Sequence, residues 1–102
     1  MGLMSLARNC GKGFRAYDAG KFSEALHILK PIADLDTLPL MKPSVRNAAR
    51  RAAVCVAQYY IALMYFHGNG VEVDASLGMS YIRKAAELGN LDAIKYLNDI
   101  DK

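Results

Sequence analysis

The sequence predicts an all-α fold: a short α-solenoid of about two helix–turn–helix repeat units, with about five helices and a long third helix. Apolar residues recur at intervals of three and four, whereas a two-residue alternation is confined to residues 71–73. The three prolines all lie between residues 31 and 43. One block of sequence also occurs twice. At 102 residues the chain has the length of one domain, which we expect to span residues 1–102.

The first unit is expected at about residues 3–35. Its first helix runs from about Leu3 to Ala19 and is weakened by two internal glycines, since each costs about 1 kcal/mol relative to alanine. Gly20 is expected to end this helix, because glycine readily adopts the left-handed conformation found just after a helix C-terminus. The second helix runs from about Phe22 to Leu35 with one apolar face, and Pro31 should kink it because proline lacks the N–H for the bond to residue 27.

An insert follows at residues 36–43, a loop with two prolines and three apolar residues (Leu38, Leu40 and Met41). These apolar residues predict either self-association or a loop that folds back over the third helix. Ser44 is a good N-cap for that helix, which begins the second unit (about residues 44–89) and extends to about Phe66.

Glycines and caps delimit the last two helices. Gly68 and Gly70 end the third helix, and at least one of them is expected to adopt a positive φ. Asp74 is a candidate N-cap for a fourth helix over about 75–88, which Gly89 stops. A short terminal helix lies at about residues 90–99, opened by Asn90 or Asp92.

An internal repeat supports two units. Residues 28–35 (ILKPIADL) align with residues 81–88 (YIRKAAEL), so that apolar, basic and acidic positions coincide. A Tyr-x-x-Gly precedes each block, at 17–20 and at 65–68. A single helix pair cannot bury its apolar face alone, so stacking of the units is expected to make the core.

The stretch 57–93 resembles a Sel-one-like repeat, a relative of the tetratricopeptide repeat. The resemblance rests on G-x-G-V-x-x-D at 68–74 followed by K-A-A-x-x-G at 84–89. Residues 16–33 resemble the tetratricopeptide-like unit that often precedes such repeats. This sequence departs from the pattern at Ala62, at Gly78 and in the long segment 36–56. The resemblance implies a helical solenoid whose motif residues are structural and whose first helices line a concave face.

Composition and charge exclude several classes. Apolar residues make up 53% and charged residues 23% of the chain, which excludes a disordered or low-complexity protein. The longest apolar stretch, residues 52–66, is too short to span a bilayer, and the N-terminus lacks the apolar core of a signal peptide. We therefore expect no membrane association and a cytoplasmic location. Cys10 and Cys55 are predicted to be buried thiols in a reducing compartment, with a single disulfide between them as the alternative.

Nothing in the sequence favours an enzyme. The two histidines lie in different units, and no metal-ligand spacing or nucleotide-binding glycine motif is present, so no catalytic residue, metal or cofactor is expected. An acid–base or metal site of His67 with Glu72 and Asp74 is the weak alternative, but Asp74 is better used as an N-cap.

The basic residues are local. The net charge is +3, yet residues 1–52 hold nine Lys or Arg against four Asp or Glu, and a cluster of four opens the third helix: Lys42, Arg46, Arg50 and Arg51. Three interpretations stay open for it: a solvated surface, a site for an acidic protein, or a site for nucleic acid. The absence of interleaved aromatic residues disfavours nucleic acid.

One surface stands out as a candidate for binding. The expected buried seam of the third helix leaves a neighbouring stripe with an aromatic centre, which we expect to lie beside residues of the first and last helices. The candidate partner-binding residues are Lys12, Arg15, Arg46, Tyr60, Leu63, His67 and Tyr96. The alternative is that Tyr60 and Leu63 are simply core residues.

The sequence therefore predicts a non-enzymatic protein–protein interaction module (an adaptor, scaffold or regulatory binding protein) that uses its concave helical face. The candidate surface has an aromatic centre and a basic flank, and Tyr and Arg dominate interface energies. Its partner is therefore expected to be a protein or peptide with apolar anchors and acidic neighbours. Two alternatives remain: a small nucleic-acid-associated regulator that binds through residues 42–51, and a purely structural subunit that forms homo-oligomers.

Overall fold

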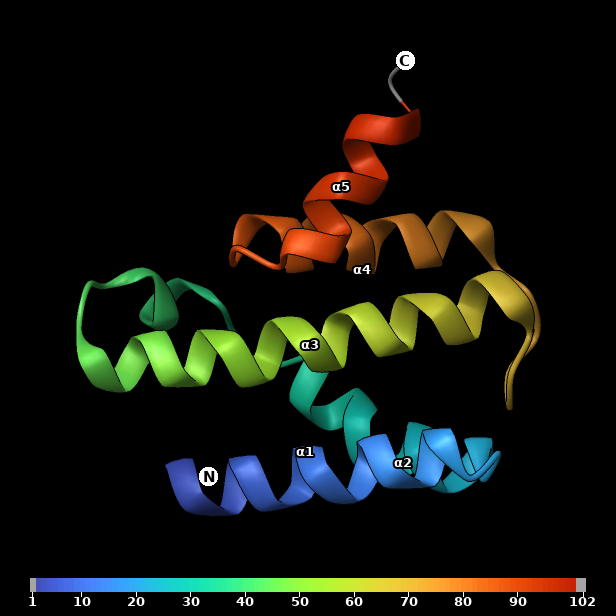
Figure 1. The fold of residues 1–102 in the computed structure, drawn as a ribbon, viewed down its shortest axis with the longest axis horizontal. Coiled ribbons are helices and arrows are strands. Elements are labelled where there is room, and N and C mark those ends of the chain that lie inside the picture. The colour runs from blue at the N-terminus through green and yellow to red at the C-terminus, as the bar shows by residue number, and fades with distance from the viewer. Residues whose placement is uncertain (1, 101–102) are drawn as a thin grey trace.

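Five α-helices and one 3-10 turn make up the computed structural model, which describes residues 2–100. The α-helices are α1 (Leu3–Asp18), α2 (Phe22–Ala33), α3 (Val45–His67), α4 (Ala75–Glu87) and α5 (Leu91–Ile100), and the 3-10 turn η1 is Leu38–Met41. No strand occurs in that part of the chain. The predicted all-α fold is confirmed: the helices form a short solenoid in which α3 packs against both the α1–α2 pair and α4 (Figure 1).

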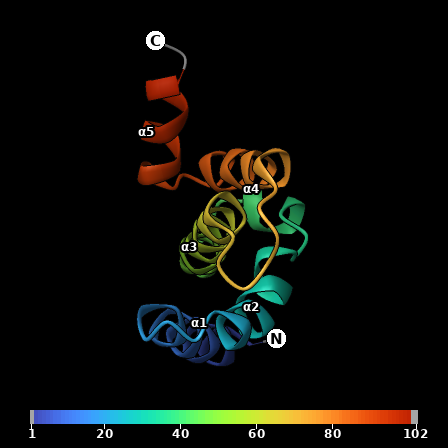
Figure 2. The same cartoon turned by 90° about the vertical axis from the view of Figure 1, so that its right-hand side faces the viewer.

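The helices form two layers. Figure 2 shows that α1, α3 and α5 stack on one side of the molecule, while α2, η1 and α4 lie on the other. The first helices of successive pairs therefore share one face. The largest fully buried side chains come from α1 to α4 and fill the space between the layers: Leu6, Leu29, Ile32, Val54, Gln58, Ile61, Met64 and Ile82.

The helix caps follow the sequence. Ser44 Oγ accepts a hydrogen bond from the Asn47 N–H (3.0 Å), and Asp74 Oδ1 accepts one from the Leu77 N–H (3.0 Å). Asn90 rather than Asp92 opens α5, because its Oδ1 accepts from the Ala93 N–H at 2.9 Å. Gly68 ends α3 with φ 72°, and Gly70 has φ 75°, so both adopt the positive φ that was expected of at least one.

The insert folds back over α3, which is one of the two arrangements that the sequence predicted for it. Leu40 of η1 is buried, whereas Leu38 and Met41 are exposed. Two side chains of α3 hold the insert in place: Asn47 Nδ2 donates to the carbonyls of residues 39 and 42, and Arg51 donates to those of residues 40 and 42. Arg51, a member of the basic cluster, thus forms hydrogen bonds inside the molecule.

Both cysteines are free and buried, at 3% and 5% exposure. Burial raises the pKa of the Cys10 thiol to about 11, and it also raises the pKa of Cys55. Because the thiolate is the reactive form, neither thiol should react with an aromatic disulfide reagent at pH 8 in the native protein. Both should react once denaturant unfolds the chain. Fast labelling of either thiol under native conditions, counted by mass spectrometry, would contradict this prediction.

Candidate functional site

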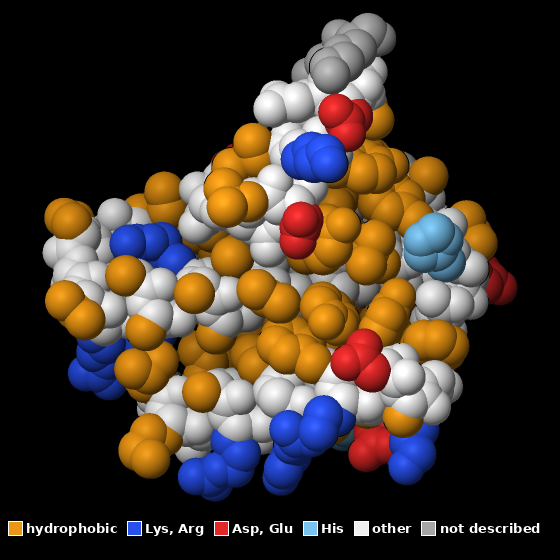
Figure 3. All heavy atoms as spheres, in the orientation of Figure 1, with side chains coloured by type: hydrophobic (Ala, Val, Ile, Leu, Met, Phe, Trp, Pro, Cys, Tyr) orange, Lys and Arg blue, Asp and Glu red, His pale blue; other side chains and the backbone are white. Residues whose placement is uncertain are grey.

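The seven candidate residues come from three helices of one layer. Lys12 and Arg15 lie on α1, Tyr96 lies on α5, and the other four lie along α3. Tyr60, Leu63 and Tyr96 are half-buried, while the remaining four are exposed. In the space-filling view of this face, apolar side chains gather over α3 and basic side chains line the edge over α1 (Figure 3).

Tyr60 joins α3 to α1. Its ring centroid lies 4.6 Å from that of Phe14 and 5.0 Å from that of Tyr17. Such aromatic pairs stabilise a contact beyond the area that they bury. The ring of Tyr60 therefore packs against α1, while its side chain as a whole is only half-buried.

Tyr96 joins α5 to α3 in the same way. Its ring stacks on that of Phe66 with a centroid distance of 5.5 Å. The Phe66 ring in turn lies against the backbone of α4 at Gly78, where a Cβ atom would approach it to 2.8 Å. The glycine that departs from the family pattern thus makes room for Phe66, which positions Tyr96 on the shared face.

Tyr59 lies on this surface, although it is not among the seven candidate residues predicted from the sequence. Burial raises the pKa of Tyr59, and the negative charge of Asp92 raises it further, with smaller contributions from Tyr17 and Tyr96. These contributions place Tyr59 among groups from α1 and α5. We call the half-buried side chains gathered here the aromatic face: Tyr17, Tyr59, Tyr60, Leu63 and Tyr96.

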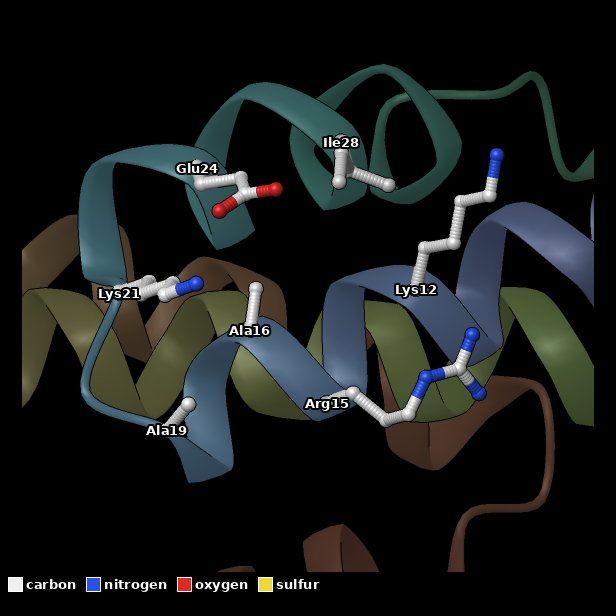
Figure 4. A pocket seen from close by; sticks show the side chains of 7 residues that line it. All are labelled: Lys12, Arg15, Ala16, Ala19, Lys21, Glu24 and Ile28. Carbon is white, nitrogen blue, oxygen red and sulfur yellow. The ribbon is translucent and has the colours of Figure 1, made fainter.

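The charges around the aromatic face differ from the expected basic flank. Burial raises the pKa of Tyr60, and Asp18 raises it further, so an aspartate lies near each of Tyr59 and Tyr60. Lys12 and Arg15 instead line a cavity of about 350 Å³ between α1 and α2, together with Lys21 and Glu24 (Figure 4). The α1 residues that contact Tyr60 are Phe14 and Tyr17, on another side of the helix.

The last two candidates lie at opposite ends of α3. Arg46 is in the first turn and His67 is the last helical residue, and both are exposed. They are 21 steps apart along the helix, which spans roughly 30 Å at 1.5 Å for each residue. They therefore bracket the aromatic face and do not join one compact site.

The opposite layer carries a polar cluster that links α2 to α4. Tyr81 Oη donates to Asp34 Oδ1 (2.5 Å), and Lys30 Nζ donates to Asp34 Oδ2 (2.8 Å) and to Tyr81 Oη (3.2 Å). Burial by itself would raise the pKa of Asp34, but the hydrogen bonds from Lys30 and Tyr81 lower it below its usual value. The cluster bridges the two repeat units.

Asp34→Asn should therefore lower the free energy of unfolding at pH 7, by less than about 1 kcal/mol because the ion pair is partly exposed. A lowered carboxyl pKa stabilises the fold above the unfolded value of about 3.9 and ceases to do so as the pH falls through the folded value. The difference from the parent should thus shrink as the pH falls from about 4 toward the lower folded pKa of Asp34. Urea unfolding at pH 7 and pH 3 measures it, with the exposed Glu87→Gln as control. A constant difference at both pH values would contradict the assignment.

Neither a metal site nor a membrane span is apparent in the described part of the chain. Within residues 2–100, no three His, Cys, Asp or Glu side chains are grouped so that they could hold a metal ion. The helices of the same range include none that is long and apolar enough to cross a bilayer.

A comparison with protein families matches one part of the chain, within the second predicted unit. Residues 55–90, about a third of the chain, match the family model of the Sel1 repeat, the Sel-one-like repeat that the sequence resembles. No curated protein and no solved structure shows significant similarity to the chain. Sel1 repeats generally act as protein–protein interaction modules and are typically non-catalytic. The matched residues comprise the second half of α3, the glycine turn and α4, and this part of the chain is therefore a Sel1-like repeat.

Proposed function

We propose that the chain is a non-enzymatic adaptor or scaffold that binds a segment of a partner protein along the aromatic face. The observation that carries the proposal is the convergence of four half-buried tyrosines from α1, α3 and α5 on one surface. Tyrosine supplies large, rigid contact area at a small entropy cost, which is why it is enriched in protein interfaces. A solenoid fold alone does not specify a partner, so the proposal rests on these residues.

The charges restrict how a partner would lie. Asp18 and Asp92 border the tyrosines, so the part of the partner above them should be apolar or basic. An acidic stretch would meet favourable charge only at the α1 edge, near Lys12 and Arg15, or near Arg46. The two free, buried thiols are consistent with the reducing environment of the cytoplasm.

The test requires a partner identified by affinity capture, followed by calorimetry with purified components. Tyr59→Ala and Leu63→Ala should each weaken binding at least about tenfold, as expected for residues at the centre of an interface. Val73→Ala, at an exposed apolar residue outside the aromatic face, is the control and should bind like the parent. Folded face variants with parental affinity would remove this surface from consideration.

A second readout separates the alternative functions. Affinity for a double-stranded DNA or RNA fragment that falls steeply with salt, in a protein without a protein partner, would favour the nucleic-acid regulator. Sedimentation that shows a stable oligomer without other partners would favour the structural subunit.

A further inference from the structure

A second surface lies at the insert, away from the aromatic face. An open cavity of about 230 Å³ lies between the start of α1, the insert and the first half of α3. We call it the insert cavity, and it is lined by Leu6, Leu35, Asp36, Pro39, Leu40, Arg50 and Val54. A cavity of roughly 150 Å³ is enough to hold a benzene molecule, so this one accommodates one large apolar side chain.

Arg50 is the unusual residue of this wall. Its Nε atom is buried and has no hydrogen-bond partner among the described residues. The carboxylate of Asp36 also lines the cavity, and its Oδ1 accepts from the Leu38 N–H at 3.1 Å. Because Arg50 lines the cavity as well, its positive charge favours an incoming carboxylate there.

Residues that neighbour the cavity lining in the chain, which we call the rim, are both apolar and basic. Leu38, Met41 and Val45 are 77%, 52% and 90% exposed, which is unusual for three large apolar residues so close in the chain. Lys42 and Arg46 lie between and beside them and are exposed as well. A ligand that fits this rim combines apolar groups with negative charge.

We propose that the insert cavity binds an acidic segment of a partner protein: one large apolar side chain enters the cavity, and a neighbouring carboxylate pairs with the guanidinium group of Arg50. Lys42 and Arg46 add favourable charge for further acidic residues. Nucleic acid would use the cations but leave the cavity empty, and a neutral peptide would leave Arg50 unpaired. None of the residues that line the insert cavity belongs to the aromatic face, so the two docking sites are separate.

The experiment uses the full chain and a fluorescein-labelled peptide with one leucine flanked by two glutamates on each side. Two further peptides replace either the glutamates by glutamine or the leucine by serine. We expect the first peptide to bind at least about tenfold more tightly than either of the others, since hydrogen bonds between charged groups are the stronger ones. Arg50→Gln should weaken its binding to a similar extent, and so should Leu35→Asp at the cavity wall.

Two control variants separate binding at the insert cavity from general charge effects and from binding at the aromatic face. Arg83→Gln removes the same charge from an exposed position on α4, and Tyr59→Ala alters the aromatic face, so both should bind the peptide within about twofold of the parent. Because Arg50 Nε makes no bond in the free protein, Arg50→Gln should not lower the thermal midpoint.

Three outcomes would overturn the proposal. The acidic peptide could fail to bind, it could bind no better than its glutamine analogue, or Arg50→Gln could bind it like the parent. Sedimentation showing a dimer that dissociates on Arg50→Gln and Leu38→Asp would assign the surface to a second copy of the chain instead of an acidic partner.

Discussion

Gly13→Ala is expected to lower the free energy of unfolding by about 1–3 kcal/mol, the usual cost of overpacking a core. A Cβ atom at residue 13 would lie 2.4 Å from Leu29 Cδ2 and 2.5 Å from Leu29 Cγ. Leu29 is fully buried, so its side chain cannot move aside into solvent. The glycine therefore sets how closely α1 and α2 approach, and the larger Gly13→Val should be more damaging.

Gly11→Ala is the matched control on the same helix. A Cβ atom there would meet only Arg15, with its flexible Nη1 at 3.2 Å. Alanine is favoured over glycine by about 1 kcal/mol in a helix interior, so this variant should be slightly more stable than the parent. Urea unfolding of both variants measures the contrast. Equal effects at the two positions would show that helix propensity, and not close packing, accounts for Gly13.

The sequence was most informative where one residue type suffices for one local structure. Ser44 and Asp74 cap helices because a short side-chain oxygen reaches the N–H three residues on, and both were predicted. Gly68 and Gly70 were predicted at turns that need a positive φ. The spacing of such signals also makes the Sel1-like repeat recognisable from the sequence alone.

Prediction was weaker wherever the outcome depends on how helices meet. The sequence placed Gly13 in α1 but not against Leu29, since that contact joins two helices. The second helix was expected to end at Leu35 but ends at Ala33, and the insert contains the short turn η1 instead of loop alone. Arg51 looked like one of four equivalent cations, yet its donors hold the carbonyls of the insert.

The candidate surface likewise combines features that one helix determines with features that depend on how helices pack. Helical periodicity placed Tyr60 and Leu63 on the stripe of α3 that borders the buried seam, which is a property of one helix. The neighbours of that stripe depend on the rotation of α1 and α5 about their own axes. The structure brings Tyr17 and Asp18 of α1 to the tyrosines, together with Asp92 of α5. A single amphipathic pattern does not determine that rotation, so Tyr59 and the two aspartates were missed.

Gly70→Ala is expected to destabilise the fold by more than 2 kcal/mol, for two reasons that add. Gly70 has φ 75°, a region that costs a residue with a Cβ atom about 1–2 kcal/mol. Its Cβ atom would also lie 3.0 Å from Phe22 Cβ, 3.1 Å from the Phe22 carbonyl carbon and 3.2 Å from the Ser23 nitrogen. Two of those atoms belong to the backbone of α2, which cannot rotate away. The β-branched Gly70→Val should be worse still.

Gly20→Ala separates the two reasons. Gly20 has a similar φ of 77°, but a Cβ atom there would meet nothing within 4 Å. Its variant should therefore show the backbone cost alone, and Gly70→Ala should exceed it by at least about 1 kcal/mol. The excess measures how tightly the glycine turn, which descends from α3 toward α2, holds the two units together (Figure 2). If both variants lost equal stability in urea unfolding, the turn would not contribute to the contact between the units, and α3 alone would join them.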